Sequence, residues 1–156
     1  MPQLRIDVSD VRRLGRDFDR TNRDLAKTLA RAMHTSLKEL SKIVRRAGYP
    51  PERPGQRYVR TLRLGKSWTE GSEGNIFEVE ATAFGATGTF GSEITDKRGR
   101  GYAAYVIGPV AGEKGERQAW MHSGRWWTLE AKAEGHLERV AEIFRDAIQK
   151  LLDKLR

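Results

Sequence analysis

A long helical periodicity in the first third of the chain limits the possible folds more than any other feature of the sequence. Large apolar residues recur there at spacings of four and three: Leu25, Leu29, Met33, Leu37, Leu40 and Val44. This spacing places them on one face of an α-helix, and that face needs a cover of other apolar groups. Gly48 and Pro50-Pro51 end the pattern, because glycine and proline are poor helix formers. We therefore predict an amphipathic helix over about residues 21–47.

The same periodicity returns near the C-terminus and predicts a second helix over about residues 129–155, with Gly135 as a kink or a late start. Its apolar positions are Leu137, Val140, Ala141, Phe144, Ile148, Leu151 and Leu155. Between the two helices, short runs rich in β-branched and aromatic residues are separated by Gly, Ser, Asn and Asp, which is typical of antiparallel strands. These runs are 66–68, 76–81, 85–90 and 102–107.

Together these elements predict an α+β protein. A small antiparallel sheet of about four to five strands, over about residues 66–108, packs against the long N-terminal helix and the C-terminal helix. One of the strands is a short edge strand over residues 3–8, where apolar and polar side chains alternate. An extended Pro/Arg loop (48–66) and a Trp-rich loop (109–128) join the elements. A length of 156 residues fits a single domain, 1–156.

Composition removes several classes of site. The chain has no cysteine, so it forms no disulfide, thiol nucleophile or Cys-based metal site. No run approaches the roughly 18 consecutive apolar residues that cross a bilayer, and the start lacks the apolar segment of a signal peptide. We expect a soluble protein without membrane contact, made and used in a cytoplasm.

Patterns for catalysis and for cofactor or metal binding are also missing. The glycine-rich run 85–91 is followed by no helix, unlike a phosphate-binding loop. The three histidines have no second ligand at metal-site spacing: His34, His122 and His136. Ser123 follows His122, but side chains adjacent in sequence usually point apart and make no catalytic pair. Glu78 and Glu80 alternate with apolar residues, which indicates the solvent face of a strand. We therefore predict no enzyme, no cofactor and no metal.

The positive charge is concentrated in the first part of the chain. The net charge is +8, and residues 1–70 hold 17 Lys and Arg against 8 Asp and Glu. Basic asymmetry of this kind favours contact with nucleic acid, an anionic membrane face or an acidic protein. Part of the excess lies on the predicted first helix, opposite its apolar face: Arg23, Lys27, Arg31, Lys38, Lys42 and Arg45. We interpret this part as a solvated face.

The rest of the excess lies in the Pro/Arg loop. These cations are three or four residues apart, with Tyr58 and Trp68 nearby: Arg53, Arg57, Arg60, Arg63 and Lys66. The pattern is compatible with non-specific phosphate contacts and stacking. Pairing with acidic groups on a neighbouring subunit, or a role in solubility, explains the cations equally well.

Tryptophan is also unevenly distributed. Large aromatic residues with arginine are typical of the centre of protein interfaces. The candidates for a subunit interface are Trp68, Trp120, Arg125, Trp126 and Trp127. Packing in the core of the chain is the alternative interpretation of the same residues.

Three segments carry a resemblance to a known family. They are Tyr49-Pro50-Pro51-Glu52-Arg53-Pro54-Gly55, then residues 58–68 ending in Ser67-Trp68, and Tyr102-Ala103-Ala104-Tyr105-Val106-Ile107-Gly108. With the final helix, they are similar to the tail-completion or head–tail joining (neck) proteins of long-tailed bacteriophages. The chain departs from the family at Leu62, where the family often has glycine. Residues 122–128 also replace a compact Pro-Phe step into the last helix.

The resemblance implies a structural virion protein. Its protomer would assemble into a ring, commonly a hexamer, at the phage neck, between the capsid connector and the tail tube. In such a ring, the cations of the Pro/Arg loop would be candidates for contact with DNA in the lumen or with a neighbouring ring: Arg53, Arg57, Arg60, Arg63 and Lys66. The implied partners are other copies of the chain, the connector, the tail-terminator or tail-tube proteins, and passing double-stranded DNA in non-specific contact. The implied location is the virion, after assembly in the cytoplasm of a bacterial host. From the residues alone, a sequence-independent nucleic-acid-binding protein acting as a monomer or dimer is the alternative.

Overall fold

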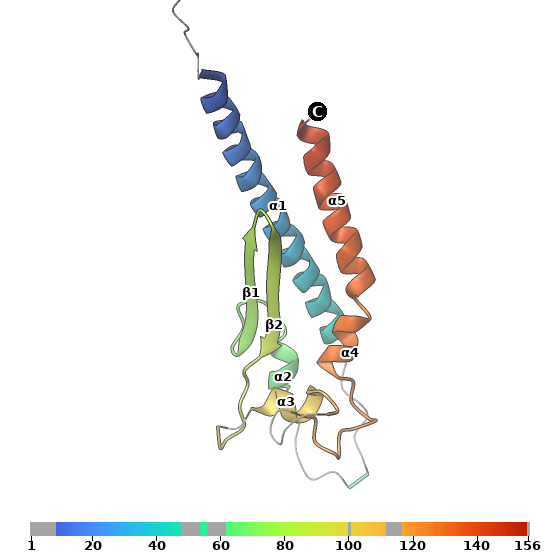
Figure 1. Cartoon of the computed structure of the whole chain (residues 1–156). Helices are drawn as coiled ribbons and strands as arrows, with labels where there is room; N and C mark the ends of the chain where they lie inside the picture. Colours follow the sequence, from blue (N-terminus) through green and yellow to red (C-terminus); the bar gives the residue numbers. More distant parts are fainter. Residues whose placement is uncertain (1–8, 48–53, 56–61, 100, 112–116, 156) are drawn as a thin grey trace, which may run out of the picture.

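The computed structural model describes residues 9–47, 54–55, 62–99, 101–111 and 117–155. The elements are α1 (Ser9–Arg46), α2 (Arg63–Lys66), β1 (Asn75–Thr82), β2 (Gly85–Ser92), α3 (Tyr102–Ile107), α4 (Leu129–Glu134) and α5 (Leu137–Leu155). In Figure 1, α1 lies between the β-hairpin and α5, and the short helices α2, α3 and α4 gather near its C-terminal end. The predicted α+β class is confirmed: two helices pack with a small antiparallel sheet.

The first helix is longer than predicted. It ends at Arg46, close to the predicted end, but begins at Ser9. The hydroxyl of Thr21, which the prediction placed at the start of the helix, lies inside it and donates a hydrogen bond to the carbonyl of Asp17 at 2.9 Å. Threonine satisfies its hydroxyl in this way within a helix as well as at a cap, so the residue does not mark a start by itself.

The prediction of four to five strands is wrong for the part of the chain that the structure describes. The sheet there has two strands, β1 and β2, paired antiparallel with Asn75 opposite Ser92 and Thr82 opposite Gly85. The predicted strands 76–81 and 85–90 are confirmed within these bounds. The run 66–68 is no strand: Lys66 ends α2 and a turn follows. Residues 3–8 lie outside the described part.

The fourth predicted run, 102–107, forms helix α3 instead of a strand. Its buried residues are Ala103, Val106 and Ile107, which are three and one positions apart and share one face of a helix. A short apolar run fits a buried strand and a buried helix equally well, and the β-branched and aromatic content misled the prediction.

The loops and the last helix follow the prediction more closely. The region 129–155 is helical but divided at Gly135, the predicted break, into α4 and α5. Thr128 caps α4, since its Oγ1 accepts a hydrogen bond from the Ala131 amide at 3.2 Å. Residues 117–128 form turns, as predicted. Most of the Pro/Arg loop lies outside the described residues, and its last part, Arg63–Lys66, is helical rather than extended.

The core lies at one end of the molecule, where α1 meets α2, α3 and the residues before α4. Its buried members are Leu40, Val44, Leu64, Trp68, Ala103, Val106, Ile107 and Trp126. Trp68 lies at the centre of the core and is 2% exposed. Its ring centroid is 5.5 Å from that of Phe90 and 6.3 Å from that of Trp127. Ser41 of α1 donates a hydrogen bond to the carbonyl of Trp68, which ties the helix to this centre.

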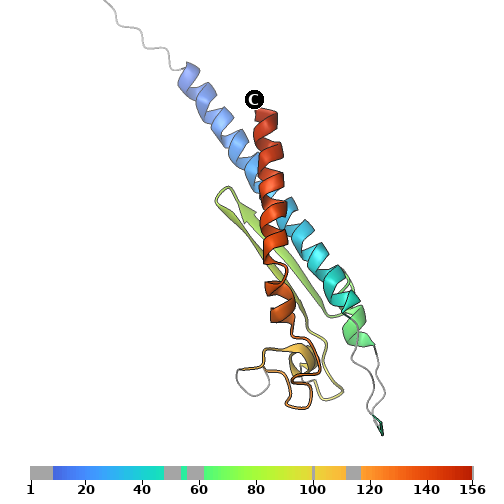
Figure 2. The ribbon, with the colours of Figure 1, turned by 90° about the vertical axis from the view of Figure 1, so that its right-hand side faces the viewer.

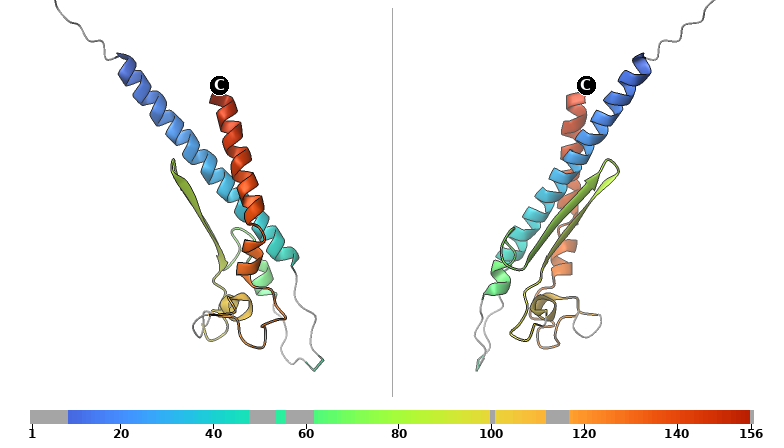
Figure 3. Two further views of the ribbon diagram at one scale, coloured as in Figure 1. Left: turned by 45° about the vertical axis from the view of Figure 1, so that its right-hand side comes forward. Right: turned by 90° about the vertical axis from the view of Figure 1, so that its left-hand side faces the viewer.

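The hairpin lies along α1, as both views of Figure 3 show. Phe77 packs edge-on against His34 of α1, with ring centroids 5.1 Å apart, and lies opposite Phe90 in the sheet. At Gly88 the two elements approach so closely that a Cβ would lie 2.6 Å from the Met33 sulfur and 3.2 Å from Leu37. A larger residue at this point of the hairpin would therefore have to displace the Met33 side chain.

Replacing Gly88 with valine tests this close approach. Gly88→Val would force the hairpin away from Met33, and we expect a loss of about 1–3 kcal/mol in the free energy of unfolding. Gly85→Val is the matched control, because nothing lies within 4 Å of the Cβ position there. Chemical denaturation of both variants measures the difference, and equal stabilities would contradict the packing described.

A second test concerns the entry into α2. Leu62 has φ 59° and ψ 4°, the left-handed region in which a side chain is strained. It is the position at which the resembling family often has glycine. We expect Leu62→Gly to raise the free energy of unfolding by about 1 kcal/mol, because glycine adopts this conformation without strain. Leu62→Ala keeps the Cβ and should bring no gain; a gain of equal size in both variants would contradict the explanation.

Candidate functional site

The structure describes two of the five cations predicted to contact DNA or a neighbouring ring. Arg63 lies on α2 and donates to Glu73, with Nη2 2.8 Å from Oε1. Lys66 ends the same helix and is exposed. Arg53, Arg57 and Arg60 lie outside the described residues. Of the predicted cations of the Pro/Arg loop, the described part therefore contains Arg63 in an exposed ion pair and Lys66 without one.

The predicted interface residues separate into two groups. Trp68 and Trp126 are buried in the core of their own chain, and Trp127 packs against that core. Trp120 is 85% exposed, and Arg125 is partly exposed. Burial within the chain accounts for Trp68 and Trp126, so Trp120 is the candidate whose ring is available to another molecule.

The turn that carries Trp120 is held from both sides. The Ala119 amide donates to the carbonyl of Tyr105 at 2.8 Å, and the Gln118 side chain donates to the carbonyl of Val106 at 2.8 Å. His122 is buried between Tyr105 and Trp126, with ring centroids 5.4 Å and 5.9 Å away. The exposed indole therefore projects from a well-anchored base.

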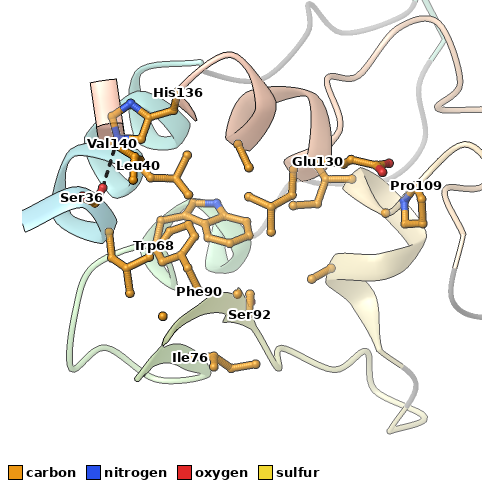
Figure 4. Close-up of a pocket in the computed structure, with 18 of the residues that line it drawn as sticks. Ser36, Leu40, Trp68, Ile76, Phe90, Ser92, Pro109, Glu130, His136 and Val140 are labelled. Atoms are coloured by element: carbon orange, nitrogen blue, oxygen red, sulfur yellow. Dashed lines mark hydrogen bonds between the residues drawn. The ribbon is translucent and has the colours of Figure 1, made fainter. Parts of the chain in front are cut away.

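An apolar groove of about 600 Å³ opens between α1, β2, α3 and the α4–α5 junction (Figure 4). Leu40, Trp68, Ile76, Phe90 and Val140 line it. Such a lining binds apolar groups, and the polar residues Ser36, Glu130 and His136 lie at its edge. Short-range sequence patterns do not reveal the groove, because its walls come from segments more than a hundred residues apart.

One polar contact crosses the wall of this groove. His136, at the α4–α5 junction, donates from Nε2 to the carbonyl of Ser36 at 3.2 Å, and Figure 4 shows this bond. The Ser36 hydroxyl is itself bonded to the carbonyl of Ala32 at 2.9 Å. Both side chains are buried. They join α1 to the start of α5 and have a structural role.

The exposed face of α1 carries a continuous row of cations. The row consists of exposed residues spaced three, four or seven apart: Arg20, Arg23, Lys27, Arg31, Lys38, Lys42 and Arg45. Among the described residues, ion pairs on this face involve only Lys38 and His34, and both contact Glu70, at 3.6 Å and 3.0 Å. The hydrogen bond from His34, together with Lys38, holds the pKa of Glu70 below its ordinary value of 4.5. We call these seven residues the basic row.

The segment between the core tryptophan and the next loop has the opposite charge. Residues 67–96 contain no Lys or Arg and six acids: Glu70, Glu73, Glu78, Glu80, Glu93 and Asp96. In β1, Glu78 and Glu80 are exposed, whereas the alternate residues Phe77 and Val79 are partly buried on the side of α1. The expectation that these two glutamates form a solvent face is confirmed. Counting charge over short windows, rather than over two parts of the chain, would have shown this contrast.

The two long helices are linked by one exposed ion pair. Arg139 of α5 contacts Glu39 of α1 at 3.0 Å and Glu142 of its own helix at 2.9 Å. The hydrogen bond from Arg139 holds the pKa of Glu39 below its ordinary value of 4.5. A carboxylate with a lowered pKa stabilises the fold above its ordinary pKa, and that contribution is lost as the pH falls through the lowered value.

Comparison of the chain with protein families, with curated proteins and with solved structures finds no match. Within the described residues, no three His, Asp or Glu side chains gather as a metal site would require. None of the helices described is both long enough and apolar enough to cross a membrane. The features that the described residues present are an exposed indole, an apolar groove and two faces of opposite charge.

The link between α1 and α5 can be tested by pH. We expect Glu39→Gln to lower the midpoint of thermal unfolding at pH 7 by about 1–3 °C, as for an exposed ion pair. The difference from the original chain should disappear as the pH falls below the pKa of Glu39. Glu142→Gln is the control, because Glu142 lies on the same helix as Arg139 and links nothing. A loss that persists unchanged at pH 3 would contradict the assignment.

Proposed function

We propose that this chain is the subunit of a ring at the neck of a long-tailed bacteriophage, a tail-completion or head–tail joining protein. In this role it connects the capsid connector to the tail tube and lets DNA pass. The protein is structural rather than catalytic, needs no cofactor and acts in the virion. The resemblance of residues 49–55, 58–68 and 102–108 to that family suggests the proposal.

The observation that carries the proposal is the number of large apolar side chains left uncovered on projecting parts of the chain. Phe84, at the tip of the hairpin, is 98% exposed, and Trp120 is 85% exposed. On α5, Leu137, Leu152 and Leu155 are also exposed. A small protein that remains alone in water seldom exposes so much apolar surface on several elements, whereas a subunit covers it on assembly.

The shape of the chain supports the same function. Figure 2 shows an elongated molecule in which α1 and α5 extend well beyond the core. A protomer of this kind presents different surfaces on different sides, which suits a head-to-tail contact that repeats around a ring. A lumen crossed by a sliding genome also requires phosphate contacts to be few and independent of sequence, because strong contacts would retard the DNA.

Mass in solution and DNA affinity, measured together, test the proposal. We expect oligomers larger than a dimer, and binding of the free chain to a short DNA duplex that is weak at 50 mM salt and lost at 200 mM. The alternative, a free-standing nucleic-acid-binding protein, predicts a stable monomer or dimer with sub-micromolar affinity. That second result would contradict the ring function.

The exposed aromatic residues supply a more specific test. We expect Phe84→Ala and Trp120→Ala each to weaken assembly at least about tenfold, as for residues at the centre of an interface. Their thermal midpoints should stay unchanged, because neither ring is packed in the chain. Leu62→Ala is the control, since Leu62 is 52% exposed but belongs to neither projection. Unchanged assembly in both aromatic variants would remove these residues from the interface.

A further inference from the structure

We infer that neighbouring copies of this chain contact each other head to tail through charge. The outer face of the hairpin of one copy, with Glu78 and Glu80, lies on the basic row of α1 in the next copy. This inference rests on the proposed ring-forming function and names the surfaces that would form the ring. It also gives a role to the charged face of the first helix, which sequence analysis interpreted as merely solvated.

The two acids cannot reach the basic row of their own chain. Phe77 faces α1 and contacts His34, so the alternate residues Glu78 and Glu80 point to the opposite side of the two-stranded sheet. No other described element packs against that side: the sheet contacts α1 alone among the elements with substantial contact. In the part of the chain that the structure describes, neither glutamate has an ion-pair partner.

The basic row is equally open. Met33 and Leu37 of α1 face the hairpin at Gly88, and Glu39 faces α5 through Arg139. The row occupies the remaining face of the helix, and all seven of its residues are exposed. Glu70 shows how a carboxylate engages this face, because it contacts His34 and Lys38 within the same chain.

The spacings of the two surfaces match. Residues four apart on a helix lie about 6 Å apart along its axis, as do Lys27 and Arg31. Residues two apart on a strand lie about 6.8 Å apart, as do Glu78 and Glu80. Two successive acids of the strand can therefore pair with two successive cations of the helix. Because the acidic and basic surfaces lie on different faces of one chain, the contact is heterologous and propagates from copy to copy.

A second copy fits the basic row better than DNA does. A copy brings both surfaces, so one repeated contact uses the acids of one chain and the cations of the next, and every interface is the same. DNA would occupy the row and leave the acidic face of the hairpin without a partner. The sheet face itself is polar, with Thr87 and Thr89 opposite the two acids, so it suits a charged partner rather than an apolar one.

Charge reversal on each surface tests the contact. One variant carries Glu78→Lys and Glu80→Lys, a second carries Lys27→Glu and Arg31→Glu, and a third combines all four changes. We expect each of the first two to weaken assembly at least tenfold, and the combined variant to recover it. Mixing the first two should also restore assembly, because each then meets a neighbour of opposite charge. Sedimentation at low salt measures assembly, and thermal midpoints verify folding.

Matched reversals elsewhere provide the controls. Glu134→Lys with Asp146→Lys, and Arg145→Glu with Lys150→Glu, change the net charge by the same amounts at exposed positions outside the two surfaces. They should leave assembly unchanged. If they weaken it as much as the first two variants, net charge rather than a defined contact controls assembly, and the inference is wrong.

The remaining outcomes separate this inference from the proposed function. A chain that stays monomeric at millimolar concentration contradicts both. A chain that forms rings regardless of the reversals keeps the proposed function and overturns the contact. Loss of assembly in both single-surface variants without recovery in the combined one overturns it too. If the reversed row abolishes binding of a DNA duplex while assembly persists, the row is a DNA surface instead.

Discussion

Packing against α1 is the interaction that holds the β-hairpin, α4 and α5 in place. A hairpin of two strands is marginally stable at best by itself, and α5 has an apolar face that needs a cover. Three neighbouring positions of α1 show how one helix serves both. Met33 contacts the hairpin at Gly88, Ser36 accepts the hydrogen bond from His136, and Glu39 pairs with Arg139 of α5. Residues three apart on a helix point in directions that differ by about 60°, so Met33, Ser36 and Glu39 turn gradually from the hairpin side of α1 to the α5 side. One helix can therefore contact both elements.

The long periodic features of the sequence were predictive, whereas the short runs were predictive only in part: 76–81 and 85–90 form strands, but 66–68 and 102–107 do not. The stripe from Leu25 to Val44 predicts α1 because a long pattern has only one explanation. Gly135 predicts the break before α5 because glycine interrupts a helical pattern. The run 102–107 became a helix because the core needed Ala103, Val106 and Ile107 on one side. The groove and the positions of Trp68 and Trp126 could not be predicted, since they depend on contacts between distant segments.

The core explains why so much of the molecule remains uncovered. It gathers around Trp68 at the end of α1, where α2, α3 and Trp126 meet. Beyond it, among the residues that the structure describes, Phe84 at the hairpin tip and Leu152 in the outer part of α5 face solvent. Because the core is at one end and the long elements project from it, the exposed apolar side chains lie where other molecules can contact them. The basic row of α1 and the outer face of the hairpin, with Glu78 and Glu80, are likewise exposed.

Charge and apolar contact would have different tasks in an assembly of such protomers. Exposed ion pairs contribute little affinity in water, but opposite potentials guide the approach of two surfaces and reject wrong registers. Phe84 follows the end of β1, the strand that carries Glu78 and Glu80. Alignment of the two acids on a neighbouring α1 would therefore also fix the position of the Phe84 side chain on that neighbour. Burial of the aromatic ring could then supply the affinity that the charges lack. In a closed ring, the number of copies would follow from the angle between the basic row of α1 and the outer face of the hairpin.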